Sequence, residues 1–159
     1  AYLRPETAGA MIGAAETAKL AVDALGSVDL GLGAAGILSK LHEVLRGSRG
    51  AAALVCVVDG CELEGGGVGN VELRAEHCDV RANVDAGILG LRVRKIRPFA
   101  ASLREGTRLV IYSDGVSGRF ALADLAGKHA AECCAFLLSR YGRARDDATA
   151  LIADVRAAP

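Results

Sequence analysis

The spacing of apolar residues changes near residue 50, and this change limits the possible folds more than any other feature of the chain. Before it, apolar side chains recur every three or four positions, which is the period of an amphipathic helix. After it, short runs are either continuously apolar or alternate with period two, as strands do. A further helical segment and a last strand follow. Because helices and strands are grouped and do not alternate as βαβ units, the pattern predicts an α+β fold with mainly antiparallel strands.

Two helices are predicted before the change, over Ala14–Leu25 and Ala34–Arg46, and a glycine follows each of them. A short strand is predicted before the first helix, over Ala8–Gly13. A third helix is predicted within Gly127–Gly142 and would turn four residues inward: Ala131, Cys134, Leu137 and Leu138. The remaining strands are predicted over Ala51–Val58, on both sides of Gly69, and over Leu91–Phe99, Thr107–Ser113 and Asp146–Arg156.

Length and charge exclude several classes of function. A chain of 159 residues suits a single domain, 1–159, expected to be a monomer. Nineteen basic residues balance nineteen acidic ones, which argues against a nucleic acid or an anionic membrane held by bulk charge. No apolar run approaches the ~20 residues that span a bilayer. The five cysteines, an odd number with two adjacent, predict reduced thiols in a cytoplasmic protein.

Two motifs are weaker than they look. Gly31–Gly36 reads "GLGAAG", a formal dinucleotide-binding pattern, but only the short polar stretch "SVDL" precedes it where a buried strand is needed. We interpret it as a small-residue helix start, with nucleotide binding as a remaining alternative. Asp59-Gly60 lies between strand-like runs and predicts a hairpin turn. The three histidines have no ligand spacing.

Acidic residues stand beside two of the predicted strands: one residue after the end of a strand, and two residues before the start of another. Asp114 follows the apolar run "LVIY" after Ser113 and stands before Gly115, where a sharp turn is expected, while Asp146 and Asp147 precede the strand-like run "ATALIADV". If these strands are neighbours, the carboxylates converge. Converging carboxylates repel unless a cation lies between them, and hard ions such as Mg²⁺ or Mn²⁺ prefer oxygen ligands. The alternative is that these residues are solvated or cap a turn.

Four stretches, taken together and in order, resemble a known family. They are "GGGVGNVELR" (Gly65–Arg74), "GILGLRVRKIRPF" (Gly87–Phe99), "LREGTRLVIYSDGVSGRF" (Leu103–Phe120) and "RARDDATALIADVR" (Arg143–Arg156). The chain resembles the metal-dependent serine/threonine phosphatases of the PP2C class, in their SpoIIE-like branch, and most of all the RsbX-type feedback phosphatases of the stressosome. The resemblance covers roughly residues 14–156.

The resemblance implies a PP2C-like α-β-β-α sandwich of two mainly antiparallel sheets flanked by helices. It implies hydrolysis of phosphoserine or phosphothreonine on stressosome or STAS-type regulatory proteins, by attack of metal-activated water. Asp114 and Asp146 would be the metal ligands, and through the metal the catalytic residues, of a two-metal Mn²⁺ or Mg²⁺ site. Asp147 takes the family's Asp/Asn place beside Asp146 and is not counted among the direct ligands.

The chain departs from the family pattern near residues 12–14. There the family has an Asp-Gly element before the helix, and an earlier strand with a further Asp; neither is present in this sequence. Three explanations stand: a degenerate phosphatase, a trimmed chain, or a loop missing from the given sequence. An alternative function is therefore a phosphatase-like binding module that has lost its metals.

A basic run, Arg92, Arg94, Lys95 and Arg97, has two interpretations. It is either a solvated edge that discourages strand addition or a docking patch for a phosphoprotein. We favour the solvated edge from the sequence.

Overall fold

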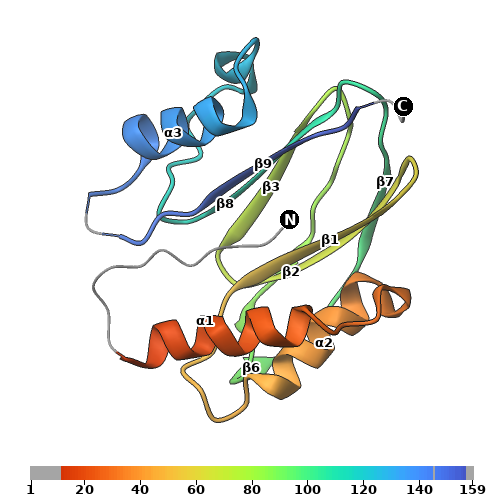
Figure 1. The fold of residues 1–159 in the computed structure, drawn as a ribbon, viewed down its shortest axis with the longest axis vertical. Helices are drawn as coiled ribbons and strands as arrows, with labels where there is room; N and C mark the ends of the chain where they lie inside the picture. Colours follow the sequence, from red (N-terminus) through yellow and green to blue (C-terminus); the bar gives the residue numbers. More distant parts are fainter. Residues whose placement is uncertain (1–11, 145, 157–159) are drawn as a thin grey trace.

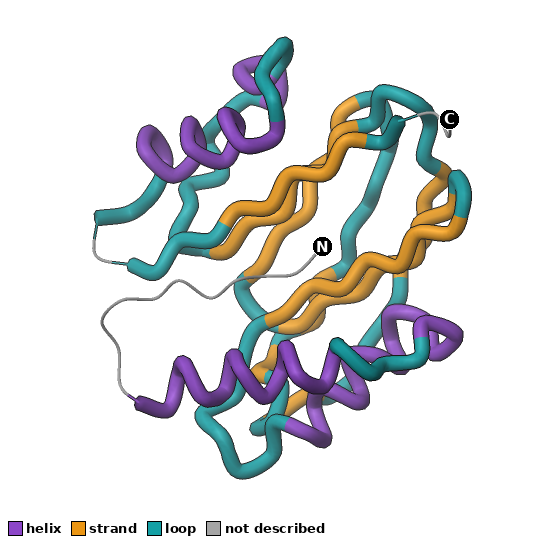
Figure 2. The backbone as a smooth tube through the Cα atoms, viewed as in Figure 1, coloured by secondary structure: helices purple, strands orange, loops and turns teal. Residues whose placement is uncertain are grey.

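Two β-sheets stack face to face, with helices on both outer sides (Figure 1). The structure is a computed structural model that describes residues 12–144 and 146–156. Helices α1 (Ile12–Leu25) and α2 (Gly33–Val44) cover the first sheet, and α3 (Ala130–Tyr141) covers the second. The layers follow one another as helix, sheet, sheet, helix, which confirms the predicted α-β-β-α sandwich and the α+β class (Figure 2).

The first sheet is organised around a glycine-rich central strand. β2 (Glu62–Val68) pairs antiparallel with β1 (Ala53–Asp59) and β7 (Phe99–Ser102), and parallel with the short β4 (Val84–Asp85). Gly65 is opposite Phe99 in the β2–β7 pairing, and the Phe99 ring occupies the space where a Cβ at Gly65 would stand. A side chain at Gly65 would therefore push the ring out of the core between the sheets.

The second sheet carries the two segments with candidate ligands. β8 (Arg108–Ser113) lies in the middle, antiparallel to β3 (Val71–Glu76) on one side and to β9 (Ala150–Asp154) on the other. A small hairpin of β5 (Gly87–Ile88) and β6 (Arg92–Val93) stands apart from both sheets. Two short 3₁₀ turns, η1 (Leu30–Leu32) and η2 (Leu122–Leu125), complete the described elements.

Three apolar clusters fill the layers. One, with Ile37 and Leu41, lies between α2 and the first sheet; one, with Leu63 and Leu109, lies between the two sheets; and one, with Val110, lies between the second sheet and α3. Successive residues of β8 therefore face different layers: Leu109 points to the inter-sheet core and Val110 to α3. This is why the β8 run is continuously apolar.

Most of the predicted elements are confirmed, with four differences. Of the predicted strand Leu91–Phe99, only Arg92–Val93 (β6) and Phe99, the first residue of β7, are strand, because between them Arg97 bonds to the side chain of Asp85 and not to a strand backbone. The inward face of α3 is formed by Cys133 and Leu137, whereas Ala131 and Leu138 are exposed.

The other two differences concern strands that were predicted early in the chain. Most of the predicted strand Ala8–Gly13 lies outside the described residues, but its last two positions belong to α1. The run predicted as Ala51–Val58 forms β1, which packs on both faces, with Val55 and Val57 against the cluster beneath α2 and Leu54 in the cluster between the sheets, although only Leu54 is buried and the others are partly exposed. The predicted hairpin turn after Asp59 is confirmed, with Asp59 paired to Glu62 across it.

Within residues 12–144 and 146–156, no single helix has the length and apolar character needed to cross a membrane. The pair Glu16–Leu25 and Leu30–Val44 passes that test jointly, by length and composition, but is bent by 96°.

Candidate functional site

Asp114 stands where the central strand of the second sheet leaves the core. Leu109, Val110 and Tyr112 are buried along β8, and Asp114 is exposed just after its end. The backbone N–H of Asp114 donates to the carbonyl of Asn70 (3.2 Å), and the Asn70 side-chain amide donates to Asp114 Oδ2 (2.9 Å). A rigid strand and one side chain thus hold this carboxylate at the surface.

The antiparallel partner strand brings the second candidate segment to the same edge. Tyr112 pairs with Ala150, so the residues just before β9 run beside those just after β8. Ser113 closes this junction: its N–H donates to the Thr149 carbonyl (3.0 Å), and its hydroxyl accepts from the Thr149 N–H (3.0 Å). The sequence-predicted residues Asp114 and Asp146 therefore lie at the same end of the sheet.

Gly115 was expected to allow a sharp turn with a positive φ angle. In the structure it is needed instead because there is no room for a Cβ at this position. The positive-φ glycines among the described residues do not include it. A Cβ at Gly115 would overlap the backbone carbonyl of Asp147 and come within 2.8 Å of Ala148 Cα. The Gly115 carbonyl also accepts from the N–H of Arg143 (2.8 Å). The absence of a side chain lets the two acid-bearing segments touch.

Asp146 is the more loosely held of the two candidate ligands. Its N–H donates to the carbonyl of Arg143 (3.2 Å), and its Oδ1 accepts from the N–H of Asp147 (3.0 Å). Both Asp146 and Asp147 are exposed. One oxygen of Asp146 is thus engaged in a local turn, on an exposed side chain.

The donor set fits one hard divalent ion better than two. Asp114 and Asp146 provide carboxylate oxygens, and Mg²⁺ is commonly held by one or two carboxylates while it keeps several waters. No group of three or more Asp, Glu, His or Cys side chains suited to a metal is found within residues 12–144 and 146–156. A two-metal centre would need further donors beyond these two carboxylates.

A hydrogen-bonded pair supports the loop that follows Asp114. The buried Tyr112 hydroxyl donates to Glu72 Oε2 (2.5 Å), across the β3–β8 pairing. Burial, with the Glu72 bond second, raises the pKa of Tyr112 to about 12, so the phenol keeps its proton at neutral pH. Next to it, Arg74 donates to the carbonyl of Phe120 (2.8 Å) and lies over the Phe120 ring.

Sequence reasoning missed Asn70 as a residue of the site. The signal was present in "VGN", which contributed to the family resemblance, but no role was assigned to it. Asn70 and Asp114 are 44 positions apart, so only the pairing of β3 with β8 shows that they meet.

The glycine motif Gly31–Gly36 is blocked as a phosphate site. It spans η1 and the start of α2, and the first strand of the described residues begins only at Ala53. The Glu64 side chain accepts from the N–H of Ala34 (2.7 Å), where a phosphate would have to sit, and stands against Gly33. An acidic side chain at this helix start repels a pyrophosphate, which supports the small-residue interpretation.

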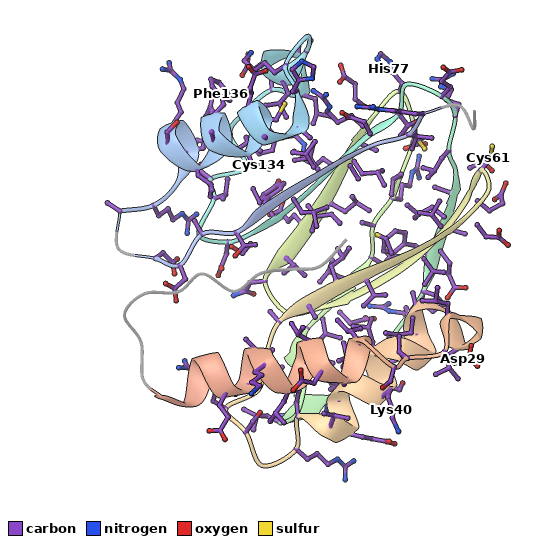
Figure 3. The ribbon with its side chains drawn as sticks, in the orientation of Figure 1. Asp29, Lys40, Cys61, His77, Cys134 and Phe136 are labelled. Atoms are coloured by element: carbon purple, nitrogen blue, oxygen red, sulfur yellow. The ribbon has the colours of Figure 1, made fainter. Side chains whose placement is uncertain are left out.

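Burial works against reactivity at two of the cysteines. All five are free. Figure 3 shows Cys61 at the tip of the β1–β2 hairpin and Cys134 on α3, on the side near β9, where its thiol lies 3.7 Å from the Ala150 carbonyl. Burial raises the pKa of Cys56 to about 11 and also raises that of Cys134, which disfavours the reactive thiolate.

Comparison with solved structures places this geometry in a family. A chain described with the bacterial stressosome, "a modular system that has been adapted to control secondary messenger signaling", is 32% identical; the match covers 91% of this chain and 78% of that one, with a TM-score of 0.79. RsbX in complex with magnesium matches with a TM-score of 0.68 at 19% identity, covering 91% and 74% of the two chains. The SpoIIE phosphatase domain from Bacillus subtilis matches at 0.53 and 18% identity, over 98% and 77%.

The chain belongs to the same family as that stressosome-described chain, and its fold is PP2C-like. The RsbX and SpoIIE matches show that this PP2C-like chain has the phosphatase-like fold, and they show the fold alone. No protein-family model and no curated protein matches it. The PP2C-like fold is thus established, while the specific branch, the activity and the ligands belong to the proposal below.

Proposed function

We propose that this protein is a Mn²⁺- or Mg²⁺-dependent protein phosphatase that hydrolyses phosphoserine or phosphothreonine. The observation that supports the proposal is that the segments carrying Asp114 and Asp146 lie side by side at one end of the β3–β8–β9 sheet. We further propose that the protein is a single domain, that it is located in the cytoplasm, and that it belongs to the SpoIIE-like, RsbX-type branch. Its substrates would be phosphorylated regulatory proteins of the stressosome or STAS type, as the stressosome and RsbX neighbours suggest.

The chain contributes position and charge to this chemistry. Asp114, fixed by Asn70 and by the end of β8, would bind the ion from one side, and Asp146 from the other. A bound divalent ion would polarise the phosphoryl group and lower the pKa of water. The backbones of the two segments that carry these carboxylates are packed together at Gly115, so the segments are already neighbours before an ion would bind.

A binding assay independent of activity tests the metal site first. Mn²⁺ at about 100 times its dissociation constant should stabilise the protein by about 2.7 kcal/mol, seen as a rise in melting temperature. Asp114→Asn should remove most of this rise. Asp79→Asn, at an exposed position, is the matched control and should keep it. A rise of equal size in the Asp114→Asn variant would show that the ion binds elsewhere.

A second assay tests the reaction. Phosphate release from a phosphoserine protein should require Mn²⁺ or Mg²⁺, stop with EDTA, and be lost in Asp114→Asn and Asp146→Asn but not in Asp79→Asn. No release from folded wild-type protein with either metal would overturn the enzyme. It would favour a phosphatase-like binding module, which the small number of carboxylates at the site within the described residues also favours.

A further inference from the structure

A groove whose charged residues are mostly basic lies between α2 and the segment that includes and follows the end of β6. Its volume is about 400 Å³, and it is open to solvent along its length. One wall is a face of α2 that includes Ser39, His42 and Glu43 and continues to Arg46, just past the helix end. The other wall is Val93–Ile96, which carries Arg94 and Lys95.

The groove presents hydrogen-bond donors and positive charge. Arg46, Arg94 and Lys95 are exposed, and none forms an ion pair with another described residue. The N–H of Gly90 donates to His42 Nδ1 (2.9 Å), so the ring hydrogen of His42 is on Nε2, which leaves another donor. Glu43 is the single carboxylate of the lining. Three cations against one anion favour a negatively charged occupant.

The basic segment is anchored and not a loose surface loop. Val93 and Ile96 pack against the cluster of apolar residues beneath α2. Arg97 is tied to the buried Asp85: its backbone N–H and its Nε both donate to that carboxylate, at 2.7 and 2.8 Å. Because the residues on both sides of Arg94 and Lys95 are fixed, these two side chains are presented beside α2 with little backbone entropy left to lose on binding.

The anchor also connects the groove to the frame of the candidate metal site. The Asp85 carbonyl accepts from the N–H of Gly69 (3.0 Å), and the next residue, Asn70, holds Asp114. The basic segment and the candidate metal edge therefore belong to one hydrogen-bonded frame. A protein bound in the groove would be held at a defined position relative to that edge.

The dimensions suit a peptide and not a small anion. The α2 wall runs from Ala35 to the helix end at Val44, a rise of roughly 14 Å at ~1.5 Å per residue, and continues to Arg46 just beyond it. About five extended residues, at ~3.3 Å each, cover that length. From this length, the open shape and the excess of cations, we infer that the groove docks an acidic, phosphorylated segment of the partner protein. The identity of this occupant as a phosphoprotein rests on the proposed function.

The test measures docking without catalysis. The probe is a fluorescein-labelled decapeptide of glutamates with a central phosphoserine, titrated in EDTA with Asp114→Asn protein and followed by fluorescence anisotropy. The double variant Arg94→Glu/Lys95→Glu should weaken binding on the order of tenfold, since each exposed ion pair contributes a fraction of that free energy. Arg81→Glu/Arg140→Glu, which changes net charge equally at exposed positions outside the groove lining, should bind within about twofold of the parent.

Each outcome decides between occupants. Equal weakening in both double variants would overturn the inference, because net charge alone would then explain binding. Absence of binding to the parent, or binding only to anionic vesicles, would also overturn it. The same peptide with serine in place of phosphoserine should bind more weakly. Inorganic phosphate at the peptide concentration should not compete with the phosphopeptide. If either expectation fails, the occupant is not a phosphorylated segment.

Docking and catalysis can fail separately. Peptide binding that depends on Arg94 and Lys95, in a protein that releases no phosphate, would retain the docking groove and reject the phosphatase. Metal-dependent hydrolysis of a small aryl phosphate, with no effect of Arg94→Glu/Lys95→Glu on peptide binding, would retain the phosphatase and reject the groove.

Discussion

Asn70 holds Asp114 through two bonds: its carbonyl accepts from the Asp114 N–H, and its side-chain amide donates to the Asp114 carboxylate at 2.9 Å. The first bond is made by the backbone and survives any substitution. The second depends on the amide. Asn70 therefore acts as a positioning residue for the candidate ligand, from a turn between the two sheets.

Removing the Asn70 amide should weaken the metal site more than the fold. In Asn70→Ala, Asp114 gains rotational freedom, and Mn²⁺ affinity should fall about three- to tenfold, while the free energy of unfolding falls by only about 1 kcal/mol. Calorimetric titration with Mn²⁺ measures the first and urea unfolding the second. Asn83→Ala, at an exposed loop position, is the control. Unchanged Mn²⁺ affinity in Asn70→Ala would remove Asn70 from the site.

Gly115→Ala should damage both stability and metal binding. The added methyl group would overlap the carbonyl of Asp147 and force the two acid-bearing segments apart. We expect a loss of about 1–3 kcal/mol, typical of overpacking, with weaker Mn²⁺ binding. Gly26→Ala is the matched control, because its Cβ would meet no atom closer than 3.4 Å. Urea unfolding of both variants measures the difference, and equal stabilities would contradict the close packing at Gly115.

The ion pair of Arg108 and Asp154 should make stability depend on pH. Arg108 Nε donates to Asp154 Oδ1 (2.6 Å), and this bond, with the guanidinium charge, holds the pKa of Asp154 below its usual range. A depressed carboxyl pKa contributes stability that is complete above the unfolded pKa, about 3.9, and is lost as pH falls through the lower folded value.

The variant Asp154→Asn tests that pair. It leaves the largely buried Arg108 without its counter-ion, although Arg108 still donates to the carbonyls of Leu125 and Lys128. We expect a loss of about 2–4 kcal/mol at pH 7 that shrinks at pH 3. Urea unfolding from pH 3 to pH 8 measures it. A loss of the same size at every pH would show that Asp154 acts by packing and not by charge.

Tyr112→Phe should lower stability by about 1–2 kcal/mol, because it leaves the Glu72 carboxylate without its phenol partner. Glu72→Gln provides the comparison, since an amide oxygen can still accept from the Tyr112 hydroxyl, and should cost less. In an alkaline absorbance titration, the phase near pH 12 should be absent from Tyr112→Phe. A late phase that persists in the variant would assign it to another tyrosine.

The period of the apolar residues and the chemistry of strand ends were enough to predict much of this protein. Helical spacing before residue 50 and strand-like runs after it determined α1, α2, β1, β8 and β9, because each of these elements buries a local, regular pattern. Asp114 and Asp146 were recognisable as candidate ligands because carboxylates adjoin buried strands in a family-like order. Their metal binding remains a prediction.

Contacts between distant residues decided the rest. The inward face of α3 keeps the predicted Leu137 but also includes Cys133, which was not predicted, because the Arg108 guanidinium, from another element, lies against the Cys133 thiol. The alternating run after residue 90 did not become a long strand, because Arg97 is drawn to the buried Asp85. The contacts of Asn70 with Asp114 and of Gly115 with Asp147 depend on which strands become neighbours. The spacing of residues along the chain does not indicate which strands pair. Only the tertiary packing of the two sheets decides that pairing.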